Sequence, residues 1–385
     1  TGEWLPAAGN LVVRCDSSTV LNPGDRAVVR GKIYPFTARH GGYGWLMTRR
    51  GYVGTLYLNR SSLLLRDTLH RELSPKHLSL FLHERAVARL DRLALAPDEQ
   101  ALCNAMTAGD RRSLSPALRA AYSRSGTSHL LAVSGLHVGI VFLLANLLLW
   151  WLPLFRHGHI LRNIAVILLI WLYAATTGFP PSVVRAALMF SVLQFALASS
   201  SEYVGMNTLA GVAFVMLLFH PDYLFDISFQ LSFIAVAGII AWGLPLCRLL
   251  RTRRKSIDML TATLAIGFSA SAATAPLISH TFGQISVVGL ALNPVVILLS
   301  YVVVGSCTLW LVIPGTALAP LFSVVAGFAA RAQNELIRAA AALPAAALDI
   351  RLTTTQCWSV YGLFIFATLL LWSAERKKSV SSLPE

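Results

Sequence analysis

Charge is scarce in this chain of 385 residues, since only 13% of them are Asp, Glu, Lys or Arg. Soluble globular domains carry about 25% charged residues. Hydrophobic residues make up 55% of the chain, and its mean hydropathy is +0.62. The composition therefore excludes an ordinary water-soluble protein and predicts a multi-pass membrane protein.

Motifs that bind metal or nucleotide are also lacking. The five cysteines form no C-x-x-C, and Cys15 stands alone in the N-terminal part, so neither a zinc site nor a disulfide framework is expected. The histidines form no H-E-x-x-H or H-x-H-x-D-H sequence, and His157 and His159 have no acidic neighbour. There is no G-x-x-x-x-G-K-[ST] phosphate loop. We expect no metal, no cofactor and no catalytic residue.

A signal-like segment is missing too, and the sequence opens at Thr1 rather than Met. We therefore expect a fragment that lacks upstream membrane anchors.

The charge that is present is unevenly distributed. Residues 1–125 hold 18 Lys and Arg against 10 Asp and Glu, while the remaining 260 residues hold 14 against 8. Alternating apolar and polar residues between turn signals predict strands in the following segments: 10–16, 22–36, 43–48 and 52–58. We predict a small five-stranded β-barrel or sandwich over residues 1–70.

Helical spacing replaces this alternation in residues 71–126. Helices are expected to open near Leu78, at Pro97 and at Pro116. Because these helices are amphipathic, we expect a connector that lies on the membrane surface or against the β domain.

Apolar runs of about 20 residues, the length that spans a bilayer, follow one another from residue 129 onward. They lie near 129–154, 160–178, 182–200, 205–220, 226–247, 258–279, 286–313, 318–343 and 357–373. We predict a polytopic α-helical membrane domain over residues 127–375, with eight or nine spanning helices and a tail at 376–385. The eighth run contains Arg331, Glu335 and Arg338, so a position along the membrane interface is its alternative.

Three short basic loops predict the orientation. They comprise residues 156–162, 247–255 and 375–378, and nine crossings place all of them on one side. The positive-inside rule assigns that side to the cytoplasm. The N-terminal domain then lies outside, and the C-terminus is cytoplasmic.

Polar residues inside the apolar runs are the candidate site residues, because polar groups are costly in lipid. Ser134 and His137 stand three residues apart, on one helical face, beside the G-x-x-x-G of Gly135 and Gly139. They either support close helix packing or line a polar path.

Two further groups have the same character. Ser182 and Arg185 follow a Pro-Pro pair, and Arg185 either snorkels to the interface or faces a polyanion or an acidic partner. Asp226, Ser228 and Gln230 enter a later run together. We predict an ion pair between Arg185 and Asp226.

One apolar run contains the sequence L-N-P. Asn293 and Pro294 predict a broken helix whose freed backbone lines a cavity or finds a partner.

Four segments together resemble ComEC-type DNA-internalisation proteins. They are L-N-P-G-D-R-A-V-V-R-G-K (21–32), H-L-L-A-V-S-G-L-H-V-G-I-V (129–141), G-F-P-P-S-V-V-R-A-A-L-M (178–189) and F-D-I-S-F-Q-L-S-F-I-A-V-A-G-I (225–239). The resemblance implies a channel in the bacterial inner (plasma) membrane that passes one strand of transforming DNA. It also implies an OB-like N-terminal domain outside the membrane.

An OB-like barrel binds single strands through a basic groove and stacked aromatic rings. The candidate DNA-binding residues are Arg26, Arg30, Lys32, Arg39, Arg49, Arg50, Tyr34 and Trp45. In the alternative interpretation the aromatic residues fill the barrel core and the arginines are only solvated.

Many family members end in a metallo-β-lactamase-like nuclease domain. Its metal motif is absent here, so we expect no nuclease activity from this chain unless a longer parent protein supplies that domain. The expected partners are single-stranded DNA, the lipid bilayer, a DNA receptor, a cytoplasmic ATP-dependent translocase, a separate nuclease and a second copy of the chain.

Two other functions stay open at this point. A-V-S-G resembles the G-x-S-G of rhomboid intramembrane serine proteases, with His280 as a distant base. Ala132 replaces the first Gly, however, and no second rhomboid motif follows. A solute transporter is the other alternative, and it leaves the basic N-terminal domain unexplained.

Overall fold

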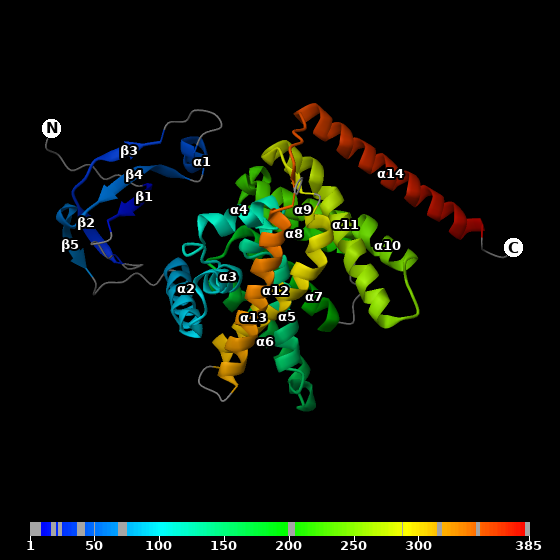
Figure 1. Ribbon diagram of the computed structural model, residues 1–385, viewed down its shortest axis with the longest axis horizontal. Coiled ribbons are helices and arrows are strands. Elements are labelled where there is room, and N and C mark those ends of the chain that lie inside the picture. The colour runs from blue at the N-terminus through cyan, green and yellow to red at the C-terminus, as the bar shows by residue number, and fades with distance from the viewer. Residues whose placement is uncertain are drawn as a thin grey trace. The chain divides into compact units, whose positions relative to one another are not determined.

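The computed structural model describes most of the chain, and its contacts divide the protein into two compact units, residues 1–81 and 82–385 (Figure 1). The described residues are 9–16, 21, 25–36, 43–49, 51–67, 75–198, 205–286, 288–313, 318–343 and 347–381.

The first unit contains five strands, the predicted number, although one of them, β5, was not located from the sequence. They are β1 (Asn10–Cys15), β2 (Arg26–Val29), β3 (Ile33–Pro35), β4 (Tyr52–Leu58) and β5 (Leu63–Asp67). The central strand β4 pairs in parallel with β1 and antiparallel with β3, while β2 and β5 form a separate antiparallel ribbon. The described residues thus form a three-stranded sheet and a two-stranded ribbon.

One predicted strand in this unit is wrong. Residues 43–48 belong to the helix α1 (Tyr43–Arg49), in which the hydroxyl of Thr48 donates a hydrogen bond to the carbonyl oxygen of Gly44, 2.9 Å away. This hydrogen bond to the preceding turn gives the Thr48 hydroxyl a partner within the helix. An alternating apolar pattern over only six residues does not distinguish a strand from a short helix.

The second unit is helical, and every apolar run expected from residue 129 onward forms a helix. Its elements are α2 (Pro75–Leu90, which begins in the first unit), α3 (Pro97–Thr107), α4 (Pro116–Arg124), α5 (Gly135–Leu148), α6 (Gly158–Thr176), α7 (Pro181–Ala198), α8 (Gly205–Phe219), α9 (Ile227–Gly238), α10 (Leu244–Leu249), α11 (Lys255–Phe282), α12 (Val288–Val312), α13 (Ala319–Ala341) and α14 (Thr354–Ser381). A small antiparallel ribbon joins β6 (Ile285–Ser286) to β7 (Ala347–Leu348).

Five segments in the described part of the chain are long and apolar enough to cross a membrane. They are Gly135–Leu154, Gly158–Thr176, Ile227–Leu249, Ile257–Phe282 and Leu292–Val312. The apolar stretches of α7 and α8 are shorter, and α13 is interrupted by charged and amide residues between Arg331 and Arg338. The chain is therefore a polytopic helical membrane protein with an N-terminal β domain, although fewer helices than the predicted eight or nine meet the length and hydropathy of a span.

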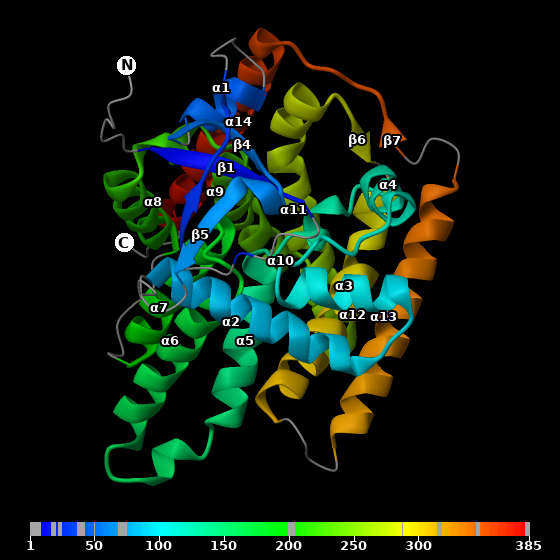
Figure 2. The same ribbon diagram turned by 90° about the vertical axis from the view of Figure 1, so that its left-hand side faces the viewer.

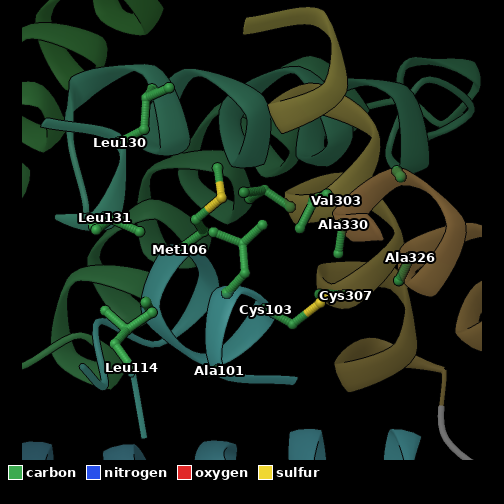
Figure 3. Close-up of a cluster of buried hydrophobic side chains, with 14 of the residues drawn as sticks. Ala101, Cys103, Met106, Leu114, Leu130, Leu131, Val303, Cys307, Ala326 and Ala330 are labelled. Atoms are coloured by element: carbon green, nitrogen blue, oxygen red, sulfur yellow. The ribbon is translucent and has the colours of Figure 1, made fainter. Parts of the chain in front are cut away.

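The helix α3 does not lie on a surface as the amphipathic pattern suggests. Eight of its eleven residues are buried, including Glu99 and Asn104. It crosses the antiparallel helices α12 and α13 and packs against both (Figure 2). Figure 3 shows Cys103 of α3 next to Cys307 of α12 in this core. The α3 part of the connector thus belongs to the core of the membrane unit.

The predicted break at Pro294 is also wrong, because α12 continues through it. The helix α11 likewise continues through Pro276. Neighbouring helices and local adjustments can satisfy the carbonyl that a proline leaves free, so prolines are tolerated inside membrane helices.

The helices α9 and α11 approach each other closely at a glycine. A Cβ atom on Gly238 would lie 2.5 Å from the Cβ of Ala273 and 3.1 Å from the carbonyl oxygen of Ser269. Directly after Gly238, residues Ile239–Gly243 form a π-helical turn that leads into Pro245 of α10. A residue as small as glycine is therefore needed at position 238 for α9 and α11 to pack this closely.

The substitution Gly238→Ala tests this contact. We expect it to destabilise the protein by about 1–3 kcal/mol through overpacking, and so to lower the midpoint of thermal unfolding in detergent. The matched control is Gly267→Ala on α11, where a Cβ meets no atom within 4 Å. Equal unfolding midpoints for the two variants would contradict the close contact.

Candidate functional site

The two predicted glycines of α5 support helix packing. A Cβ on Gly135 would lie 3.6 Å from the Cβ of Ala186, and one on Gly139 would lie 3.2 Å from the Cζ of Phe190. Both pairs are four residues apart on their helices, so α5 and α7 run in the same direction along one seam. The packing interpretation of the G-x-x-x-G is confirmed.

This seam brings the N-termini of α5 and α7 together. The hydroxyl of Ser182, in the first turn of α7, donates a 2.8 Å hydrogen bond to the carbonyl oxygen of Val133, just before α5. The first turn of a helix carries unsatisfied N–H groups and a partial positive charge. Two such positive ends therefore lie side by side.

Ser134 and His137 form a helix cap and not a catalytic pair. The backbone N–H of Ser134 donates to Nδ1 of His137 at 3.0 Å, so the imidazole proton is on Nε2. That Nε2 is buried and has no hydrogen-bond partner. His280 donates from Nδ1 to the carbonyl oxygen of Leu352 at 3.0 Å. Neither histidine accepts a hydrogen bond from the Ser134 hydroxyl, so the geometry gives the protease alternative no support.

Arg185 of α7 is a buried cation that faces α9. The residue is 2% exposed, and its guanidinium carbon lies 5.3 Å from the centre of the Phe233 ring on α9. Its Nη1 atom has no hydrogen-bond partner. A buried guanidinium without an ion-paired carboxylate is costly, which makes Arg185 a candidate functional residue.

The predicted ion pair between Arg185 and Asp226 is wrong, although Asp226 acts on Arg185 electrostatically at longer range. The carboxylate of Asp226 instead caps α9. Its Oδ1 accepts the backbone N–H groups of Ser228 at 2.8 Å and Phe229 at 3.3 Å. The free N–H groups at a helix start attract the carboxylate and hold it away from the arginine.

The remaining predicted residues have local roles or lie apart. Gln230 donates from Nε2 to the carbonyl oxygen of Leu224 at 2.8 Å, and Ser228 is exposed. Asn293 lies on α12, which packs against α5, and its Oδ1 is buried without a hydrogen-bond partner. The structure therefore groups Ser182 with Ser134 and His137, and it links Arg185 to the start of α9.

Some polar contacts between the spans were missed by the sequence analysis. Gln194 of α7 donates to Oδ1 of Asn163 on α6 at 2.6 Å, and Arg162 donates to Oδ1 of Asn146 on α5 at 2.9 Å. Amides inside apolar runs were the signal that could have revealed them. The hydroxyl of Tyr173, which packs in the same apolar cluster as α5 and α7, is buried without a partner.

The loop after α3 packs on the ends of α5 and α6. Gly109 has a φ of +83°, and a Cβ there would lie 3.2 Å from Val133 and 3.7 Å from the carbonyl oxygen of Thr177. Beside it, Arg112 donates from Nε to Asp110 at 2.9 Å, which holds the pKa of that carboxyl below its usual value. The start of α5 and the end of α6 are thus covered in part by this loop.

In the first unit, one sheet face combines cations with exposed aromatic rings. Arg14 pairs in register with Tyr57, and Tyr34 pairs with Thr55, so Arg14, Tyr34 and Tyr57 share a face. Tyr34 and Tyr57 are 52% and 55% exposed, and their ring centres are 5.8 Å apart. Arg14 lies 5.9 Å from the centre of Tyr57, and Lys32 lies 5.9 Å from that of Tyr34.

The other predicted DNA-binding residues are scattered or lie outside the described residues. Arg26 and Arg30 are exposed, while Trp45 is half-buried. Arg39, Arg50 and the side chain of Arg49 lie outside the described residues. Arg14 and Tyr57 were not predicted, because their position beside Tyr34 depends on the strand register.

Comparisons with known proteins identify related sequences. The sequence model of a family described as Competence protein matches residues 106–377. ComE operon protein 3 of Bacillus subtilis (strain 168) is 33% identical over 204 residues, which cover 52% of this chain and 24% of that protein. An uncharacterized protein of Aquifex aeolicus (strain VF5) is 29% identical over 201 residues, which cover 52% of this chain and 45% of that protein. The matches span less than half the length of both relatives, and no solved structure matches.

Two substitutions at Asp226 separate capping from charge pairing. We expect Asp226→Ala to lower the free energy of unfolding by about 0.5–2 kcal/mol, the usual cost of losing an N-cap. Asp226→Asn should retain most of that stability, because Asn is an equally good cap. Thermal unfolding in detergent measures both, with the exposed Ser228→Ala as control. Equal losses for Asn and Ala would show that the charge matters and not the cap.

Proposed function

Because the chain belongs to the Competence protein family, we propose that it forms a path by which single-stranded DNA crosses the bacterial inner membrane during natural competence. The observation that carries this proposal is Arg185, a buried cation without a hydrogen-bonded partner, beside two helix N-termini.

Electrostatics at the start of α5 and α7 favour an anion. Each helix N-terminus carries about half a positive charge, and Arg185 adds a full one in the first turns of α7. The phosphates of a nucleic acid strand are the polyanion that the family suggests. Asp226 stands at the start of α9 and would weaken this positive field.

Unsatisfied polar atoms support a hydrated path in the same region. Nε2 of His137, the hydroxyl of Tyr173 and Nη1 of Arg185 are buried without partners. Leaving a buried polar group unpaired costs about 1–3 kcal/mol. Water or a passing strand would satisfy these groups, and hydrocarbon would not.

The charge distribution supports an inward direction of transport. Arg251, Arg253 and Arg254 are exposed in the loop between the spans 227–249 and 257–282, and the positive-inside rule places such loops in the cytoplasm. The N-terminal ends of α5 and α7 then face outward, as does the N-terminal β unit. A DNA strand that enters from outside would meet the positively charged N-terminal ends of α5 and α7 first.

The β unit would hold the strand before entry. Exposed Tyr34 and Tyr57 offer stacking surfaces for bases, and Arg14 and Lys32 lie within reach of phosphates. Stacking on aromatic residues is worth about 1–3 kcal/mol per base and depends little on sequence. Energy for transport, reception of the DNA and degradation of the second strand would come from partners: a cytoplasmic ATP-dependent translocase, a DNA receptor and a separate nuclease.

Arg185→Met tests the path in cells. The variant loses a charged hydrogen bond to phosphate, worth about 1.5–3 kcal/mol, so transformation should fall about tenfold or more. Its thermal stability should be unchanged or higher, because the buried charge has no ion-pair partner to lose. Arg185→Lys keeps the charge and should retain more transformation than Met. Normal transformation by Arg185→Met at equal protein levels would refute the proposed role.

The double substitution Tyr34→Ala with Tyr57→Ala tests the β unit in the full chain. We expect it to weaken binding of a fluorescent oligothymidylate by about 2–6 kcal/mol for two stacked bases, measured by anisotropy in detergent. Val13→Ala, on the other face of β1, is the control. Binding by the unchanged protein should weaken strongly with salt, since phosphate contacts release counterions. Equal affinity for the double variant and the control would refute the stacking role.

A further inference from the structure

The exposed face of α13 changes character halfway along the helix. Six of its exposed residues recur every three or four positions and therefore form one stripe: Leu321, Val324, Phe328, Arg331, Glu335 and Arg338. Val324 and Phe328 are 69% and 76% exposed. The side chains of Arg331 and Glu335 are 68% and 65% exposed. The stripe is thus apolar in its first half and charged in its second.

The charged half lies at the depth of a membrane span. The helices α12 and α13 form an antiparallel pair, and Val303 lies beside Ala330 in their shared core (Figure 3). Val303 stands near the centre of the 21-residue span Leu292–Val312. Arg331, the next residue after Ala330, is therefore near mid-depth, and Glu335 is one turn further along.

At the same depth, the exposed side chains of α12 are apolar. Val295 and Leu298 of α12 are 51% and 64% exposed, and antiparallel pairing brings them to the level of the charged half of α13. These apolar side chains of α12 can face the hydrocarbon core of the membrane. The two helices of the pair thus present opposite surfaces, one apolar and one charged.

Ion pairs to α3 hold the charges of α13 in place without covering them. Nε of Arg331 lies 2.7 Å from Oε1 of Glu99, and Arg338 pairs with Asp98 and, at 2.8 Å, with Glu335. A charged side chain at mid-depth in lipid costs several kcal/mol, and the short Glu335 side chain cannot reach the interface from there. The charged face of α13 therefore does not border lipid hydrocarbon.

We propose that the face of α13 from Arg331 to Arg338 borders water at membrane depth, so that the α12–α13 pair separates lipid from a water-filled vestibule. The two arginines stand against three carboxylates of Asp98, Glu99 and Glu335, so this wall does not attract a polyanion. It differs in this from the N-terminal ends of α5 and α7. The inference does not depend on what crosses the membrane.

Spin-label accessibility in liposomes tests the proposal on the full chain. Cys15 is exposed and Cys247 half-buried, so both are first replaced by Ser, while Cys103, Cys307 and Cys357 are buried and stay. A nitroxide is then attached to Glu335→Cys or, as the matched control on the same stripe, to Val324→Cys. Power saturation compares collisions with water-soluble nickel-EDDA and with lipid-soluble oxygen.

We expect the ratio of nickel to oxygen accessibility to be several-fold higher at position 335 than at 324. A label at 335 that meets mainly oxygen would place this face in lipid and overturn the proposal. A label that meets neither reagent would place it against protein, with the same consequence. Ala339→Cys, an exposed neighbour that makes no ion pair, replaces Glu335→Cys if that variant does not fold. This readout needs no DNA, so it stands or falls separately from the proposed transport.

Discussion

Hydrocarbon offers no hydrogen bonds, and this constraint explains several of the polar side chains in the membrane unit. His137 accepts the N–H of Ser134, Asp226 accepts two N–H groups of α9, and Ser182 donates to the carbonyl before α5. Each contact satisfies backbone groups at a helix end that lipid would leave unpaired. Arg185 is conspicuous against this background, because its Nη1 has no such partner.

The buried helix α3 gives the unit a second kind of support. It places Asp98 and Glu99 beside α13, a helix whose arginines would otherwise be uncompensated at membrane depth. Its apolar side chains, among them Cys103 and Met106, join the core of α12 and α13. A segment that precedes the first span is therefore part of the membrane unit, and the charged wall of α13 exists because α3 is there.

Hydropathy alone predicted the helices from residue 129 onward, because lipid imposes a strong and simple pattern on sequence, while the family was recognised from the resemblance of four short segments. Hydropathy could not predict the hydrogen-bond partners of the polar residues. Asp226 can neutralise Arg185 or cap α9, and only the helix start shows that capping wins. Pro294 reads as a break until the surrounding helices are known. The burial of α3 likewise depends on α12 and α13, which lie about 200 residues away in sequence.

The π-helical turn at Ile239–Gly243 has a consequence for sequence change in the family. A π turn contains one residue more than an α-helical turn, and each residue rotates a helix by about 100°. Deleting one residue here would convert the turn to regular helix and leave α10, with the arginines that follow it, facing nearly the same direction, because the π turn accommodates its extra residue within one turn. Relatives with and without this residue would therefore present the same faces on both sides of the turn, with their sequences offset by one position. Alignments of this segment should therefore first be checked for a one-residue insertion or deletion at the turn, and only then for residue identity.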